Sequence, residues 1–149
     1  MSLAAHLRDH RARLDDLVTL LDHERRLLAA GQVDGEQLAE VAARKRERLA
    51  ELERFERQRR QVQQRLGYPD DRDGDQRAAG DAGCAALWHG ILDTARRAAR
   101  LNRDNGTVIG VRMEHNQRLL NVLQEQAGQR LYGPDGQARG SGRRLDQRA

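Results

Sequence analysis

The chain has 149 residues, of which 38% are hydrophobic, 34% charged and only 3% aromatic. This length suits one domain with a modest core, and the composition is typical of long helices that share narrow apolar seams. The net charge is +4, but the 27 basic residues are interleaved with 23 acidic ones. With so few aromatic side chains for bases to stack on, we do not expect nucleic acid as a partner.

Cysteine content and hydropathy exclude further classes. Cys84 is the only cysteine, so a disulfide framework and a cysteine-based zinc site are excluded. Residues 1–10 carry charges among their leucines and lack the apolar core of a secretory signal. No stretch approaches the roughly 20 apolar residues of a membrane span. We therefore expect a cytoplasmic protein without stable membrane insertion.

Residues 3–30 carry the apolar repeat of a coiled-coil-like helix, with alternating steps of four and three residues. Ser2 is suited to cap its N-terminus, Gly31 to end it in a left-handed conformation, and Asp34 to cap the next helix. The repeat consists of Leu3, Leu7, His10, Leu14, Leu17, Leu21, Glu24 and Leu28.

A second helix is predicted from about residue 35 to residue 66, and the short loop before it predicts an antiparallel hairpin. Its seam consists of Leu38, Val41, Lys45, Arg48, Leu52, Phe55, Arg59, Val62 and Leu66. Folding the hairpin about residue 33 brings Glu24 within one turn of Lys45, the only lysine of the chain. We predict that they form a partly buried pair that fixes the register. The alternative is two separately solvated charges.

Residues 67–83 are rich in Asp and Gly and predict a flexible linker. A third helix is expected over residues 84–127. Its seam passes through Asn105 and Gly106 without losing phase, which favours one continuous helix over a break at that dipeptide. The seam consists of Trp88, Leu92, Ala95, Ala99, Asn102, Gly106, Ile109, Met113, Asn116, Leu120, Leu123 and Ala127.

Amides and glycines interrupt this third seam. Buried amides are unfavourable unless they are hydrogen-bonded, and a glycine weakens a helix by roughly 1 kcal/mol relative to alanine. One interpretation is that these residues specify register and let helices approach closely. The other is a distortable segment used in partner binding. The set consists of Asn102, Asn105, Gly106 and Asn116, and it joins Glu24 and Lys45 as a predicted structural constellation.

The third helix has a second apolar row besides its seam, made of Val108, Val111, Leu119 and Val122. A hairpin covers only one stripe of a third helix, so Leu120 and Leu123 of the seam are expected in the core. The second row would then be an exposed patch that binds a partner helix. The alternative is that a homodimer or a fourth helix buries it.

No catalytic, metal or cofactor site is predicted. His6 and His10 share a helix face but lack a third ligand at a matching spacing. No nucleophile and base can be paired, so an enzyme is not expected. The fold class predicted is all-α, an antiparallel bundle of three to four long helices with coiled-coil-like seams. It forms one domain over residues 1–128, followed by a mobile C-terminal tail over residues 129–149.

Several motifs occur in an order that resembles the FlgN-like family of flagellar type III export chaperones. The resemblance covers residues 14–136, and its most specific parts are the Asn-Gly block and the tyrosine motif. The motifs are Glu24-x-x-Leu-Leu28 with Gly31, Leu38-x-x-Val-x-x-x-Lys45-x-x-x-Leu49-x-x-Leu52, Trp88, Asn102-x-x-Asn-Gly-x-x-Ile109 and Tyr132-Gly-Pro-Asp-Gly136.

The resemblance implies a cytosolic chaperone that binds no nucleotide and holds hook-associated proteins (FlgK- and FlgL-like) before export. It implies that the C-terminal part binds this cargo, and that Tyr132 docks on the cytosolic domain of the export gate. The competing interpretation is a non-catalytic coiled-coil dimerisation or structural module. Such a module would need the seams but not the second apolar row or the tyrosine motif.

Overall fold

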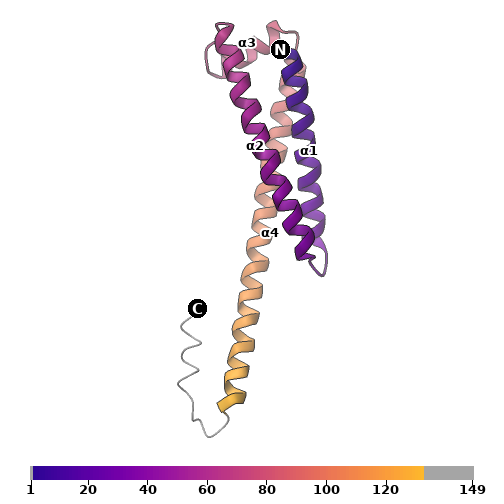
Figure 1. The fold of residues 1–149 in the computed structure, drawn as a ribbon, viewed down its shortest axis with the longest axis vertical. Coiled ribbons are helices and arrows are strands. Elements are labelled where there is room, and N and C mark those ends of the chain that lie inside the picture. The colour runs from indigo at the N-terminus through magenta and orange to yellow at the C-terminus, as the bar shows by residue number, and fades with distance from the viewer. Residues whose placement is uncertain (1, 133–149) are drawn as a thin grey trace. The chain divides into compact units, whose positions relative to one another are not determined.

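The computed structural model of the protein describes residues 2–132, with the side chains of residues 2–128. Every regular element in this range is a helix (Figure 1), which confirms the predicted all-α fold. The helices are α1 (Leu3–Ala29), α2 (Gly35–Arg65), α3 (Arg72–Asp81) and α4 (Ala85–Tyr132). Among the described residues, no helix is long and apolar enough to cross a membrane.

The chain divides after Gly106 into two compact units. Unit 1 comprises residues 1–106 and unit 2 begins at Thr107, so α4 contributes to both. Within unit 1, α1 packs against α2 and α4, and α4 runs in the same direction as α1 but antiparallel to α2 (Figure 1). The buried apolar residues of this core are Leu3, Leu7, Leu14, Leu17, Val18, Leu21, Ala78, Ala79, Cys84, Trp88, Ile91 and Ala98.

Two of the three residues predicted to cap or end the first two helices are confirmed. The Ser2 side chain accepts a hydrogen bond from the Ala5 backbone N–H, and Asp34 accepts from those of Glu36 and Gln37. The predicted left-handed conformation of Gly31 is wrong, because α1 ends earlier, at Ala29. Ala30 leaves α1 with extended backbone at φ −66° and ψ 145°, so no left-handed residue is needed there.

The segment between the second and third predicted helices is not all loop, because α3 occupies residues 72–81. Asp71 caps α3 by accepting a hydrogen bond from the Gly74 N–H at 2.7 Å. Asp73 and Asp75 lie in its first turn, where negative charge is favourable to the helix dipole. The aspartates that favoured a loop are therefore the residues that start a helix.

Helix α4 is continuous through Asn105 and Gly106, as the unbroken periodicity favoured, and it reaches Tyr132 rather than ending near residue 127. Its predicted core seam is correct only in part. Trp88 is buried as predicted, whereas Ala99 and Gly106 are exposed. The residues that precede them, Ala98 and Asn105, are buried instead, although the predicted seam did not include them. Leu120 and Leu123 are both 52% exposed, so their expected burial is wrong. Periodicity shows which side chains share a helix face, and it does not show whether another helix covers that face.

A small aromatic cluster near the N-terminal end of α1 holds two buried histidines. The rings of His6 and His10 lie 5.1 and 6.0 Å from the ring of Phe55, measured between centroids. His6 Nε2 donates to the Phe55 carbonyl oxygen at 2.8 Å. Burial lowers the pKa of His10 below 6.5; the charge of Glu56 opposes this shift, whereas His6 and Arg59 add to it.

The lowered pKa of His10 predicts that acid destabilises the fold. The unfolded chain binds the proton more readily than the folded chain, so stability is complete above pH 6.5 and is lost as the pH falls through the lowered pKa. We expect the free energy of unfolding to fall less between about pH 7.5 and 5.5 in His10→Gln than in the wild type. The exposed His89→Gln is the control. Parallel pH profiles for His10→Gln and the wild type would contradict this prediction.

Candidate functional site

A buried carboxylate links the three long helices of unit 1. Glu24 of α1 is only 2% exposed, and the Lys45 Nζ of α2 donates to both of its oxygens at 3.1 and 3.2 Å. The Asn105 Nδ2 of α4 donates to Glu24 Oε1 at 2.9 Å and to the Leu21 carbonyl oxygen at 3.0 Å. The charge of Glu24 therefore has a cation and a hydrogen-bond donor from the two neighbouring helices.

Lys45 also connects the buried Glu24 to an exposed residue of α4, because the Lys45 Nζ donates to Asn102 Oδ1 at 3.1 Å. The structure thus brings together Glu24, Lys45, Asn102 and Asn105. The register of the predicted hairpin indicated that Glu24 and Lys45 form a pair. The amides of the third predicted helix indicated Asn102 and Asn105. What sequence reasoning missed is that the two pairs are one network. The signal was available in retrospect, since a buried Glu and a buried Asn each need partners.

The remaining two residues of the predicted constellation lie elsewhere. Asn116 is exposed in unit 2. Gly106 is exposed, and a Cβ added there or at Gly110 would meet nothing within 4 Å. Close approach of another helix therefore does not explain these glycines, which removes one of the two reasons that the sequence suggested for them.

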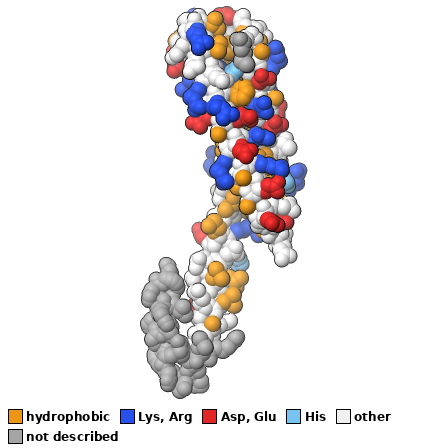
Figure 2. Space-filling view, in the orientation of Figure 1, with side chains coloured by type: hydrophobic (Ala, Val, Ile, Leu, Met, Phe, Trp, Pro, Cys, Tyr) orange, Lys and Arg blue, Asp and Glu red, His pale blue; other side chains and the backbone are white. Residues whose placement is uncertain are grey.

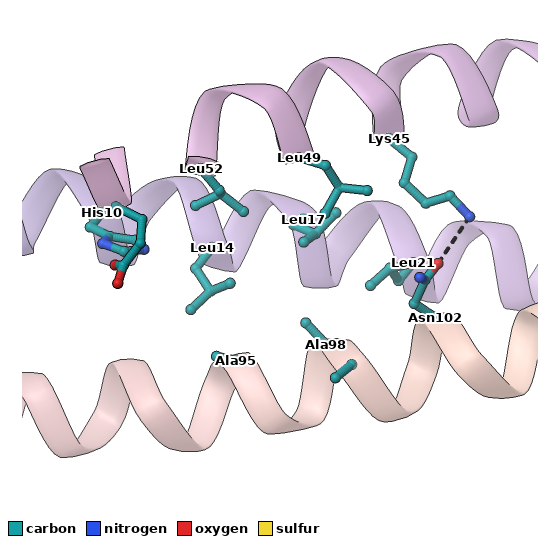
Figure 3. A pocket seen from close by; sticks show the side chains of 12 residues that line it. His10, Leu14, Leu17, Leu21, Lys45, Leu49, Leu52, Ala95, Ala98 and Asn102 are labelled. Carbon is teal, nitrogen blue, oxygen red and sulfur yellow. Dashed lines mark hydrogen bonds between the residues drawn. The ribbon is translucent and has the colours of Figure 1, made fainter. Parts of the chain in front are cut away.

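An apolar groove of about 380 Å³ runs along unit 1 between α2 and α4 (Figure 3). Leucines of α1 form its floor, Leu49 and Leu52 of α2 form one wall, and small side chains of α4 form the other. The sequence does not predict this groove, because the residues of its seams are expected to cover one another. It is lined by His10, Leu14, Leu17, Leu21, Lys45, Leu49, Leu52, Glu56, Ala95, Ala98, Ala99 and Asn102.

Unit 2 carries a second apolar surface, formed by one segment of α4. Its exposed side chains include the four predicted for cargo, which are between 41% and 58% exposed, and Figure 2 shows hydrophobic side chains on this segment. Three further residues of the predicted core seam are exposed with them. The seven are Val108, Val111, Met113, Leu119, Leu120, Val122 and Leu123, and we call them the unit 2 apolar surface.

The last predicted site residue, Tyr132, is the final residue of α4. Its side chain and the following glycine motif lie outside the described side chains. Within the described residues, no group of three or more potential metal ligands comes together. His6 and His10, the pair that sequence analysis weighed as a metal edge, instead pack on Phe55.

Unit 1 therefore has an apolar groove, and unit 2 has an apolar surface. Comparison with known proteins places the chain in a family. The model of the FlgN protein family matches residues 1–140. The chain belongs to the FlgN family. This confirms the resemblance that the motifs carried.

Curated relatives agree over most of the chain. The flagella synthesis protein FlgN of Salmonella typhimurium is 36% identical over 124 residues, which cover 83% of this chain and 81% of the relative. The protein of the same name from Yersinia enterocolitica is 30% identical, covering 86% and 83% of the two chains. That of Escherichia coli is 29% identical, covering 91% and 88%. No solved structure matches the chain.

Membership of the FlgN family assigns the general role. The family is one of flagellar export chaperones, which are binding proteins rather than enzymes. The all-helical structure, with an apolar groove in unit 1 and the apolar surface of unit 2, suits such a role, because contiguous exposed apolar patches mark partner sites.

The buried cluster generates a prediction for the stability of this FlgN protein. Lys45→Met leaves the carboxylate of Glu24 buried without its cation, and we expect it to cost about 3 kcal/mol of unfolding free energy. The exposed neighbour Arg46→Met is the matched control and should change stability by less than about 0.5 kcal/mol. Urea denaturation of both variants measures this difference. Equal stabilities would show that Glu24 does not depend on Lys45.

Proposed function

We propose that this FlgN protein is a cytoplasmic chaperone that binds hook-associated proteins of the FlgK- and FlgL-like type and delivers them to the flagellar export gate. The observation that carries the proposal is the exposure of seven large apolar side chains on unit 2. Such a surface is unfavourable in water unless a partner covers it for part of the time. A protein that escorts another polypeptide has that need.

The breadth of the unit 2 apolar surface supports a helical cargo. At 3.6 residues per turn, Met113, Leu120 and Leu123 lie on one side of α4, and Leu119, Val122 and Val111 continue around it over an arc of roughly 200°. A single helix usually covers a stripe of about 100°. The surface therefore has room for more than one apolar helix of the cargo, packed by interdigitating side chains.

The first test separates cargo binding from folding. Leu119→Asp and Leu120→Asp should each weaken binding of the C-terminal segment of a hook-associated protein at least about tenfold, because a charge replaces an apolar contact. Both side chains are about half exposed, 51% and 52%, so the melting temperature should stay nearly unchanged. Titration of a labelled segment into the full chain measures the affinity.

Gln117→Asp is the control, since this exposed residue lies on the polar side of the same helix. It should bind the segment as the wild type does. Failure of the wild type to form a complex at micromolar concentrations with any hook-associated segment would remove the proposal. Unfolding by Leu120→Asp alone would instead mean that this side chain is part of a core.

Delivery is proposed to depend on Tyr132, as the family resemblance implies. An aromatic ring with a hydroxyl group is a good anchor at an interface, because it gives a large contact area for two side-chain torsions. Tyr132→Ala should abolish capture by the cytosolic domain of the export gate, while cargo affinity and melting temperature stay unchanged. Tyr132→Phe keeps the ring and should retain part of the capture. A large loss of thermal stability with normal capture would show that Tyr132 serves the helix end instead.

A further inference from the structure

The two units of the chain differ in how their part of α4 is held. In unit 1, α4 contributes buried apolar side chains, which include Trp88, Ile91 and Ala98. In unit 2, no described side chain of residues 107–128 is buried. Local stability within a protein is low where few apolar side chains are buried and the backbone hydrogen bonds are exposed to water. The part of α4 that carries the unit 2 apolar surface is therefore the less stable part of this helix.

Asn105 marks the position at which the buried contacts of α4 end. Its Nδ2 donates to the Leu21 carbonyl oxygen at 3.0 Å and to Glu24 Oε1 at 2.9 Å, and the residue is 2% exposed. The helix up to this residue is thus anchored to α1. Because an anchored helix already provides the nucleus, the residues that follow need only propagation, and their own helix propensity decides how far the helix extends.

Two glycines occupy the positions where this propagation starts. Gly106 follows Asn105 directly, and Gly110 lies one helical turn later. Each glycine lowers the equilibrium constant for a helical residue roughly fivefold relative to alanine, so the two together lower it about 25-fold. A Cβ at either position would meet nothing within 4 Å. Packing among the described residues therefore does not require glycine at these positions, and the pair weakens the helix.

We infer that the segment of α4 from Gly106 to Tyr132 unfolds locally in the free protein, and that bound cargo restores its helix. This inference rests on the proposed function. The side chains of the unit 2 apolar surface share one side only while the segment is helical, because the helix aligns residues three and four positions apart. Cargo that packs on this surface stabilises the helix, so part of the binding free energy is used to order the segment.

Local unfolding gives the chaperone a way to release its cargo. The contacts of the unit 2 apolar surface are lost together when the segment leaves the helical conformation. The buried cluster of Glu24, Lys45 and Asn105 stays intact, because its contacts end before Gly106. The apparent affinity for cargo is proportional to the fraction of free chains in which the segment is helical. The glycines thus keep the affinity below the value that the apolar surface alone would give.

The first measurement is amide hydrogen exchange of the full chain, followed residue by residue with NMR. The double variant Gly106→Ala with Gly110→Ala should raise the protection of the amides of residues 111–128 roughly fivefold to 25-fold, and it should leave residues 85–105 unchanged. Gly80→Ala is the matched control. Gly80 is an exposed glycine of α3, and a Cβ there would also meet nothing within 4 Å. The same substitution in unit 1 should not change protection in unit 2.

The second measurement uses the labelled C-terminal segment of a hook-associated protein. The double alanine variant should bind this segment about threefold to 25-fold more tightly than the wild type, mainly because it dissociates more slowly. Gly80→Ala should bind the segment as the wild type does. In the wild type, a saturating concentration of the segment should raise the protection of residues 111–128 at least about tenfold.

The outcomes separate this inference from the proposed function. If Leu119→Asp loses the segment, but the double alanine variant has the protection and affinity of the wild type, local unfolding is wrong and the proposed function stands. If protection rises in the double variant while affinity stays the same, cargo does not require the ordered helix, and the inference is again wrong. A hook-associated segment that binds but protects only residues of unit 1 would overturn both, because unit 2 would then hold no cargo.

Discussion

Burying the carboxylate of Glu24 is unfavourable unless a cation and hydrogen-bond donors reach it, and in unit 1 these come from two other helices. Lys45 supplies the charge from α2, and Asn105 supplies an amide from α4. Each of these contacts needs one axial position of its helix relative to α1, whereas leucine seams tolerate shifts along the axis. The same lysine then orients Asn102 at the end of the groove. One buried charge therefore sets both the register of the core and the polarity of the adjacent surface.

The opposite end of unit 1 is held by a cation instead of a carboxylate. Arg59 is only 3% exposed, lies 4.7 Å from the ring centroid of Trp88, and donates to Glu56, Gln63 and Asp75. These contacts connect α2 with both α3 and α4. Polar networks at both ends of the groove explain how a core with few aromatic side chains keeps one arrangement, because each network is satisfied only when all of its helices are in place.

The sequence predicted the helices well, but it predicted less well which helix faces are covered by other helices. The seam of α1 is buried at every position, since a regular heptad leaves a helix one apolar face to cover. Beyond Gly106 the same periodicity continues through Leu120 and Leu123, yet these side chains are exposed. Periodicity cannot distinguish a face that is covered within the chain from one that a partner covers. The groove escaped prediction for a related reason, because it depends on the spacing between α2 and α4 rather than on any pattern along one helix.

Glycines at positions 106 and 110 weaken α4 where unit 1 ends, by roughly 1 kcal/mol each relative to alanine. Nothing lies within 4 Å of the place where their Cβ atoms would be, so packing does not compensate for this cost. The first residue of the pair directly follows Asn105, which is 2% exposed and anchored to α1. The helix is therefore firmly held up to Asn105 and intrinsically weaker immediately after it. The contacts that hold the buried cluster of Glu24 therefore end before the glycines begin.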